Sequence, residues 1–425
     1  MQNLVLNLKS LLKNKFLQNI NVILIENIVS KGINFVIILL LTRLLTPDIY
    51  GKYSFISVFV IASATIFDFG MDNTSIRFAA KEKKYNKSVF GLYFLVKAMF
   101  AVFIAAIIYL FAASIFTKIG KPEIIEFIPF LIFGAIGEYF LLVNDAYFQS
   151  VERFKFRAFV NISRYILALI YVVILYFLGK FSLNLILYIY FIPLIICLAF
   201  TFNYVTFVKS LMSNFLPKNI LKDIFNYEKW MFFLSIANTL LIRIDIIMLS
   251  IWVGFDKIGI YNAAFQLACV VSLLPMAVEK VMLPKLSGLN KGNIIFFTKK
   301  SFKTIFILAL IILLFIPLTW FIPGLIYGKQ YNEAGLVLQI LLIGFLLSFI
   351  LLPLDQAFFA FGKPKFNTLS KYLQLFMIII LNILTIPTLG YIWAAINVVI
   401  ARLVYALILG IFFIKEINKY SHIKK

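Results

Sequence analysis

The sequence predicts an all-α, polytopic membrane protein, and two observations carry that prediction. Twelve apolar stretches, each about 20 residues long and so able to cross a bilayer as a helix, follow one another along the 425 residues. The chain is 63% hydrophobic and 14% charged, with a mean hydropathy of +1.00. Soluble domains carry far more charge, and a water-soluble fold could not bury this much apolar surface. A membrane β-barrel would instead show short alternating segments.

Each apolar stretch is expected to form one transmembrane helix, with boundaries good to a few residues. The expected helices are 20–42, 49–69, 88–113, 124–149, 157–178, 182–208, 230–252, 257–282, 301–323, 334–359, 367–387 and 391–414. The connecting loops are too short to hold a soluble catalytic domain. The activity is therefore expected within or beside the bilayer.

The positive charges lie in every second gap between the apolar stretches. If both termini are cytoplasmic, 27 of the 40 Lys and Arg residues fall in the inner gaps and six in the outer gaps. Short loops rich in Lys and Arg stay on the cytoplasmic side, so both termini are expected in the cytoplasm. This distribution also accounts for the net charge of +22 without a nucleic-acid partner.

The two halves of the chain repeat each other in two places. The segment 47–53 recurs as 255–261, with Asp, Gly and Tyr each shifted by 208 positions, and the segment 145–156 parallels 355–366 with a shift of 210. An even number of spans separates the copies, so the halves share one orientation. We expect two six-helix bundles related by a pseudo-two-fold axis along the membrane normal, with a cleft between them.

The repeat predicts three parts of the chain. They are an N-terminal bundle at 1–208, a cytoplasmic linker at 209–229 that contains Pro217, and a C-terminal bundle with a basic tail at 230–425. Ahead of the first span, an interfacial helix is expected because its leucines share one helical face. These leucines are Leu4, Leu8, Leu11 and Leu12.

Several enzyme classes are excluded by missing residues. The only histidine, His422, lies in the C-terminal tail, so no Ser-His or Cys-His pair can form inside the membrane. The sequence has no HExxH motif, no Cys/His metal spacing and no GxxxxGK[ST] loop, which excludes ATP binding by a Walker motif. No cofactor and no metal are therefore expected. Transport work would draw on an ion gradient, the membrane potential or downhill movement of substrate.

Five basic residues inside the expected spans are the candidate substrate ligands, because a charge at the bilayer centre costs at least about 2.5–3.5 kcal/mol. They are Lys31, Arg243, Arg402, Lys97 and Arg164. Two alternatives stay open: Arg164 could extend to the headgroups, and the deeper cations could form buried ion pairs that fix helix packing. Because these cations outnumber the deeply buried acids, an anionic phosphate or pyrophosphate is the simplest ligand.

Five acidic residues in or near the spans are candidate proton or Na⁺ sites, or else counter-ions of the buried cations. They are Asp68, Glu138, Asp145, Asp245 and Asp355. Arg243 and Asp245 stand two positions apart, so their side chains diverge on a helix and are not expected to pair.

Two groups of motifs resemble the Wzx-like polysaccharide flippases of the multidrug/oligosaccharidyl-lipid/polysaccharide exporter superfamily. The segment 42–54, TRLLTPDIYGKYS, resembles that family's first loop and second span. Residues 244–248 (IDIIM), Gly254 and residues 258–264 (IGIYNAA) are similar to its seventh and eighth spans, and Phe69-Gly70 through Arg77 fits the end of its second span. The resemblance covers nearly the whole chain, while the candidate cations Lys31, Lys97 and Arg402 lie outside these motifs.

The resemblance implies a non-enzymatic flippase that moves undecaprenyl-pyrophosphate-linked oligosaccharide from the inner to the outer leaflet, for O-antigen, capsule or a related glycan. Membrane lipids and other membrane proteins of glycan assembly are the further partners it implies. Two alternatives are a cation-coupled multidrug antiporter of the same superfamily and a membrane polymerase or ligase of lipid-linked glycan. The basic excess disfavours the first, and the short outer gaps disfavour the second.

Overall fold

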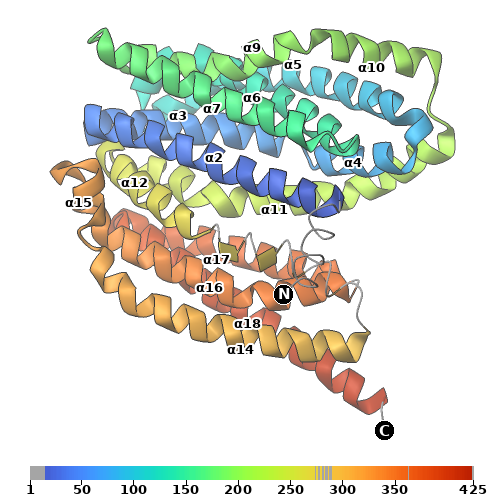
Figure 1. Cartoon of the computed structure of the whole chain (residues 1–425). Helices are drawn as coiled ribbons and strands as arrows, with labels where there is room; N and C mark the ends of the chain where they lie inside the picture. Colours follow the sequence, from blue (N-terminus) through green and yellow to red (C-terminus); the bar gives the residue numbers. More distant parts are fainter. Residues whose placement is uncertain are drawn as a thin grey trace, which may run out of the picture. The chain divides into compact units, whose positions relative to one another are not determined.

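The computed structural model describes residues 15–423 except 273, 276–277, 280–281, 283–285, 287–289 and 362. Helices make up nearly all of this part of the chain, and the described residues contain no strand (Figure 1). The all-α prediction is confirmed. The expected interfacial helix at the N-terminus lies outside the described residues.

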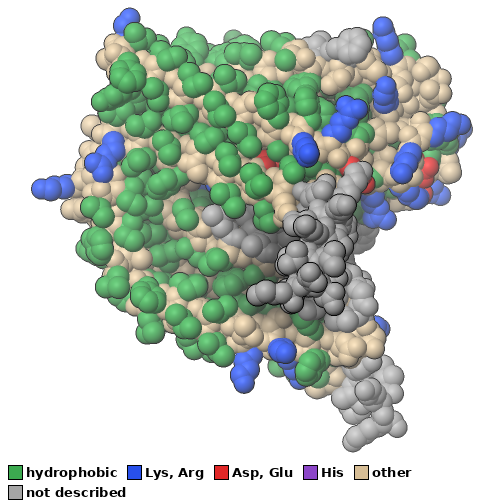
Figure 2. Space-filling view, in the orientation of Figure 1, with side chains coloured by type: hydrophobic (Ala, Val, Ile, Leu, Met, Phe, Trp, Pro, Cys, Tyr) green, Lys and Arg blue, Asp and Glu red, His purple; other side chains and the backbone are tan. Residues whose placement is uncertain are grey.

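Ten helices within the described residues are long and apolar enough to cross a membrane. The sixth expected span is a bent pair, 183–199 and 203–213, whose two parts meet at 49° and would make an eleventh. The eighth expected span begins as α12 (Phe255–Val271) and then enters a stretch that is described only in part. The protein is thus a multi-pass membrane protein, and the number twelve stays a prediction. On the face shown in Figure 2, hydrophobic side chains cover the helices, and Lys and Arg gather towards the helix ends.

The chain divides into two compact units. Unit 1 comprises Met1–Leu41 and Phe59–Ile236, and unit 2 comprises Thr42–Val58 and Ala237–Lys425. The helices of unit 1 are α2 (Lys15–Leu44, which ends in unit 2), α4 (Met71–Lys81), α5 (Asn86–Lys118), α6 (Ile128–Ser150), α7 (Phe154–Phe177), α8 (Leu183–Leu187), α9 (Phe191–Ala199) and α10 (Thr201–Ser213). The helices of unit 2 are α12, α14 (Lys291–Phe315), α15 (Ile322–Tyr327), α16 (Ala334–Ala360), α17 (Pro364–Leu389) and α18 (Ile392–Ile423).

Besides α2, two helices have residues in both units. Most of the expected linker 209–229 is helical, because α11 runs without interruption from Lys218 to Trp252 and contains no Gly or Pro. Only 214–217 is irregular. The second shared helix is α3 (Pro47–Ile66), whose first half packs within unit 2 and whose second half packs within unit 1.

The first repeated motif is a helix crossing in unit 2. Gly51 on α3 and Gly259 on α12, which are 208 positions apart, let the two backbones touch. A Cβ atom on Gly51 would lie 1.8 Å from the carbonyl oxygen of Phe255, and one on Gly259 would lie 2.2 Å from that of Pro47. Each glycine therefore faces the carbonyl four residues before its counterpart. The two copies resemble each other because they occupy equivalent places in one contact.

The same crossing is completed by a second pair with the same spacing. Asn262 Nδ2 donates a hydrogen bond to Ser54 Oγ at 2.9 Å, and both side chains are buried. Because a buried polar group needs a partner, this bond favours one register of α3 against α12.

The core of unit 1 is built by α5, which packs against α6 and α10, while α6 packs against α9. Aromatic rings fill the space between them; the ring centroids of Phe90 and Tyr147, for example, are 5.3 Å apart. In unit 2, α16 is the central helix and packs against α12, α14 and α18. These two central helices place the polar residues described next.

Candidate substrate-binding site

Two arginines predicted as substrate ligands meet in unit 2, although 159 positions separate them in sequence. The guanidinium carbon of Arg243 on α11 lies 5.0 Å from the ring centroid of Phe265, and that of Arg402 on α18 lies 5.0 Å from the ring centroid of Phe345. The two rings are themselves 6.2 Å apart, so they join the cations into one site. Each arginine gains a cation–π contact, which stabilises a charge that has left water.

Asp245, the acid closest to this site in sequence, makes its hydrogen bonds with other residues. Asp245 is buried; its Oδ2 accepts a 2.5 Å hydrogen bond from the hydroxyl of Tyr261, and its Oδ1 accepts one from the backbone of Ile246 at 2.8 Å. Asp245 interacts electrostatically with both Arg243 and Arg402. One carboxylate thus faces two guanidinium groups.

Each of the two arginines has a donor nitrogen without an acceptor among the described residues. Nη1 of Arg243 and Nη1 of Arg402 are buried, and neither has a hydrogen-bond partner among the residues that the structure describes. A buried donor without a partner is costly, and an arginine fork suits the oxygens of a phosphate. Two buried guanidinium groups with unused donors thus lie over two neighbouring phenylalanine rings.

Lys97 has a different environment. It is 0% exposed in unit 1, and its Nζ lies 2.8 Å from Asp68 Oδ1 and 3.5 Å from Asp72 Oδ1. It also donates to the backbone oxygen of Tyr139 at 3.0 Å and lies over the rings of Tyr93 and Tyr139. An ammonium group has three donors, and all three have acceptors here. Lys97 therefore has no donor left for a pyrophosphate, and Asp68 is its counter-ion.

Arg164 is also paired within unit 1. Its Nη2 lies 2.5 Å from Glu138 Oε1, and its guanidinium lies 5.1 Å from the ring centroid of Tyr165. The sequence left open that the deeper cations form buried ion pairs, and in the structure Arg164 forms such a pair. Glu138 is thus a counter-ion.

Asp145 belongs to a four-residue network between α2, α6 and α7. Arg157 Nε donates to Asp145 Oδ1 at 2.6 Å, and its Nη2 donates to Asp145 Oδ2 at 2.9 Å, while its Nη1 reaches Glu26 at 3.4 Å. Asn161 donates to Glu26 at 2.7 Å and to Asp145 at 2.9 Å. Asp145 is thus a counter-ion, and its partner is a residue that sequence analysis counts only as a loop cation.

Asp355 stands at the position equivalent to Asp145 in the second half. It accepts a hydrogen bond from the hydroxyl of Tyr405, and its backbone oxygen accepts one from Asn367 at 3.0 Å. Lys371 interacts with Asp355 electrostatically and donates to Asn238 Oδ1 at 2.8 Å.

Lys31, the fifth predicted cation, is half-buried on α2 and belongs to unit 1. Its predicted place beside Arg243 and Arg402 stays a prediction.

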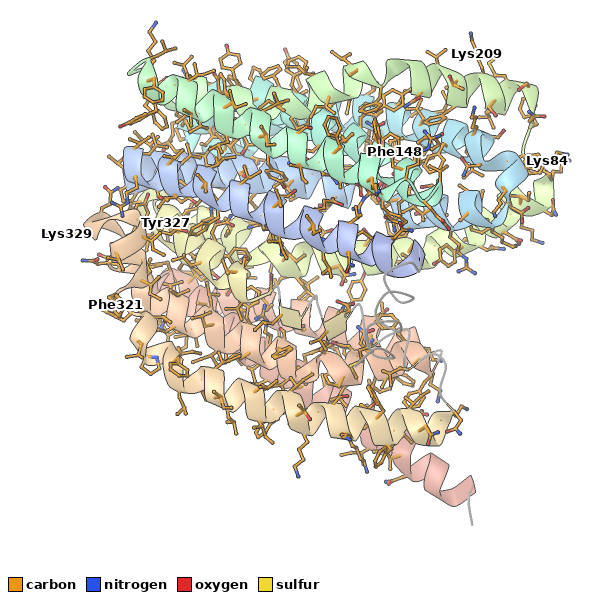
Figure 3. All side chains as sticks on the ribbon, viewed as in Figure 1. Lys84, Phe148, Lys209, Phe321, Tyr327 and Lys329 are labelled. Atoms are coloured by element: carbon orange, nitrogen blue, oxygen red, sulfur yellow. The ribbon has the colours of Figure 1, made fainter. Side chains whose placement is uncertain are left out.

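Unit 1 also contains two cavities. One, of about 610 Å³, lies at the turn between α4 and α5 and is lined by Lys83, Lys84 and Lys87 together with Asn86 and Ser210. Figure 3 shows Lys84 at this end of unit 1, which is also where Lys209 lies on α10. The other, of about 920 Å³, is lined mainly by apolar side chains of α4, α5 and α11.

Comparison with known proteins places the chain in a family. The model of the polysaccharide biosynthesis protein family matches residues 16–290, well over half of the sequence. The chain belongs to the polysaccharide biosynthesis protein family. Among curated relatives, the capsular polysaccharide biosynthesis protein CapF of Staphylococcus aureus is 26% identical over 413 residues, which cover 94% of this chain and 99% of CapF.

Two solved structures show the fold that this polysaccharide biosynthesis protein shares. The lipid II flippase MurJ, in an inward closed conformation, matches with a TM-score of 0.70 at 14% identity and covers 92% of this chain and 87% of MurJ. A multidrug resistance MATE family transporter in an inward-facing conformation matches with a TM-score of 0.67 at 16% identity and covers 93% of this chain and 95% of the transporter. Both confirm the predicted superfamily fold.

Sequence analysis of this polysaccharide biosynthesis protein missed the residues that make the arginine site possible. Phe265 and Phe345 are two of 48 phenylalanines, and nothing in the sequence distinguishes them. Gly344 does carry a signal, because a glycine inside an apolar helix often marks a close approach. A Cβ atom at Gly344 would lie 2.9 Å from Arg402 Nη1, so the glycine leaves room for the guanidinium group.

Proposed function

We propose that this polysaccharide biosynthesis protein flips undecaprenyl-pyrophosphate-linked oligosaccharide repeat units from the cytoplasmic to the outer leaflet by alternating access. The observation that carries the proposal is the arginine pair: two guanidinium groups with unused donors share one carboxylate inside a membrane protein. A pyrophosphate would supply the missing negative charge and the missing acceptors. The arginines bind and orient the ligand, and no bond needs to form or break.

The comparisons support the class of cargo. CapF is named for capsular polysaccharide biosynthesis, and MurJ is named as a flippase of lipid II. A family devoted to polysaccharide synthesis with a flippase-like fold fits the movement of a lipid-linked glycan. We extend this to a bacterial inner membrane protein with both termini in the cytoplasm and to two bundles, 1–208 and 230–425, that rock about the segment 209–229. The one-sided distribution of Lys and Arg supports that orientation.

The basic cavity of unit 1 supports the proposed direction of transport. Its lysines lie at the end of unit 1 that the charge distribution assigns to the cytoplasm, and a phosphate-bearing lipid would meet them before it moves deeper. The Arg243 and Arg402 site would then hold the pyrophosphate during the transition, with Lys31 as a third cation. Lys97 and Arg164 are left out of this site because their charges are balanced within unit 1.

The test is a flipping assay in vesicles that contain the purified chain and a lipid-linked oligosaccharide with a labelled sugar. A membrane-impermeant reagent that modifies the sugar reports how fast the glycan changes leaflet. Hydrogen bonds to a charged group contribute about 1.5–3 kcal/mol, so Arg243→Ala and Arg402→Ala should each slow flipping by about 10- to 100-fold. Arg402→Lys should recover only part of the rate, because lysine offers a point charge in place of a planar fork.

The control is Arg153→Ala, because Arg153 is an exposed arginine at the start of α7. Its rate should match that of the unmodified chain. The proposal fails if Arg243→Ala and Arg402→Ala also flip at that rate. Efflux of a cationic dye by the unmodified chain, with no movement of the glycan, would instead support the multidrug antiporter.

A further inference from the structure

Two carboxylates and one lysine are held together at the turn between α3 and α4. Asp68 lies in that turn, and Asp72 lies in the first turn of α4. Between them, Phe69 (φ 54°) and Gly70 (φ 86°) take left-handed backbone conformations, which reverse the chain. The reversal lets Asp68 Oδ2 accept the backbone N–H of Asp72 at 3.3 Å. The two side chains are thus fixed near each other by the backbone.

Lys97 neutralises only one of these two carboxylates. Its Nζ lies 2.8 Å from Asp68 and 3.5 Å from Asp72, and Tyr93 donates its hydroxyl to Asp68 at 3.2 Å. Two acids that share a site and one cation cannot both stay ionised at low cost in a medium of low dielectric. The simplest arrangement is a single proton on one of the two carboxylates.

The other charged and titratable groups around the pair do not remove this imbalance. From α6, Asp145 adds negative charge but is held by Arg157, and the hydroxyl of Tyr139 donates to a backbone oxygen. From α11, Glu228 forms a hydrogen bond with Thr74 and interacts electrostatically with Asp68, and it brings no positive charge to the pair. On α4 itself, the guanidinium of Arg77 lies over the ring of Tyr227, 4.2 Å from its centroid.

The two carboxylates differ in the exposed fraction of their side chains. The side chain of Asp68 is 7% exposed and that of Asp72 is 22% exposed. Burial raises the pKa of Asp72 well above its usual range, and although Lys97 opposes this shift, the negative charge of Asp68 adds to it. Asp72 therefore combines a preference for the protonated form with the greater exposure of the two carboxylates.

We propose that Asp68 and Asp72 form a proton-binding site, in which Lys97 balances one carboxylate and Asp72 exchanges a proton with water. One proton binds a carboxylate oxygen when the site loads, and the same proton leaves to water when it empties. Resting on the flippase function proposed above, we assign to this exchange the coupling of glycan movement to a proton gradient.

The structure offers a path from this site to the rest of the molecule. A Cβ atom at Gly70 would lie 2.8 Å from the backbone oxygen of Met231, so the turn is in contact with α11. Helix α11 continues into unit 2 and carries Arg243. A change of charge at the turn acts directly on a helix that both units share.

The first test does not depend on any substrate. The purified full-length chain is titrated while infrared difference spectroscopy follows the carbonyl stretch of protonated carboxyl groups. Asp72→Asn removes the exchangeable member of the pair, and Asp48→Asn is the control, because Asp48 is an exposed aspartate paired with Lys52 on α3. A protonated carboxyl band at neutral pH that is present in the unmodified chain and in Asp48→Asn but lost in Asp72→Asn supports the site. An unchanged band in Asp72→Asn overturns it.

The second test uses the flipping assay with a pH difference across the vesicle membrane. Coupling to one proton allows each pH unit to shift the final glycan distribution by up to about tenfold. In Asp72→Asn that dependence should vanish while downhill flipping continues; a dependence equal to that of the unmodified chain overturns the coupling. If the unmodified chain moves no glycan at all, the flippase function fails, and the infrared titration still decides the proton site. Asp68→Asn is the weaker choice, since it strips Lys97 of its nearest counter-ion and endangers folding.

Discussion

The glycine crossing between α3 and α12 gives the sharpest prediction about stability. Gly51→Ala places a methyl group 1.8 Å from the Phe255 carbonyl oxygen, whereas ordinary contact begins at 3.4 Å, so the helices must separate by up to 1.6 Å (3.4 minus 1.8). At Gly259 the same subtraction gives 1.2 Å (3.4 minus 2.2). Because each obstacle is a backbone atom, no side chain can rotate out of the way.

The cost follows from overpacking. Inserting a methyl group into a packed interior costs about 1–3 kcal/mol, and the upper end applies when backbone must move. Against that, alanine in place of glycine favours a helix by about 1 kcal/mol. Gly410→Ala on α18 is the matched control, because nothing lies within 4 Å of its Cβ position. Both variants gain the helix preference of alanine, so it cancels between them, and Gly51→Ala should be less stable than Gly410→Ala by the overpacking cost, about 1–3 kcal/mol.

The assay is reversible unfolding of the purified chain in mixed detergent, followed by circular dichroism. One separation of α3 from α12 relieves both clashes, so the double variant Gly51→Ala with Gly259→Ala should lose less stability than the sum of the single variants. If Gly51→Ala proves as stable as Gly410→Ala, the two backbones are not in contact and our explanation of the repeat is wrong.

Two further predictions concern ion pairs. Arg157→Ala should destabilise the chain by about 3 kcal/mol, because it leaves the carboxylates of Asp145 and Glu26 without their cation. This is the lower end of the cost for a broken buried pair, since the side chain of Arg157 is 17% exposed. Unfolding in detergent measures the loss, and the control Arg153→Ala should change stability by under about 0.5 kcal/mol. The second pair joins Lys257 to Glu333, which stands just before α16, and the hydrogen bond from Lys257 lowers the pKa of Glu333. The pair therefore stabilises the fold above the ordinary pKa of glutamate, and this stabilisation is lost as the pH falls through the lowered pKa. Glu333→Gln should accordingly unfold slightly more easily than the unmodified chain at pH 7 and equally easily near pH 3; a difference that persists in acid would contradict the ion pair.

The membrane spans could be predicted from the sequence, whereas the partners of the buried charges could not. Hydropathy located the spans because a membrane helix must be apolar along its whole length. Helical geometry predicts that Arg243 and Asp245 diverge, and the carboxylate of Asp245 makes its hydrogen bonds with Tyr261 and Ile246. The counter-ions of Lys97 could not be predicted, since Asp68 and Asp72 reach it only through the reversal at Phe69 and Gly70. Sequence alone places cations by depth, whereas their partners depend on tertiary contacts.

The second repeat shows that a fold can conserve a charge arrangement while its residues exchange places. Asp145 is bound by Arg157 and Asn161, one helical turn apart on α7. A shift of 210 positions carries these to Asp355, Asn367 and Lys371, where the amide comes first and the cation second. In each half, an aspartate near the end of one helix accepts a hydrogen bond from an amide at the start of the next helix, on the carboxylate of Asp145 and on the backbone oxygen of Asp355, and it interacts with a cation there. Because residues i and i+4 share one face of a helix, either order presents the same pair to the acid. Arg243 and Arg402 lie outside this repeated arrangement, so the repeat gives them no structural role, and they stay the cations that we propose to act on a ligand.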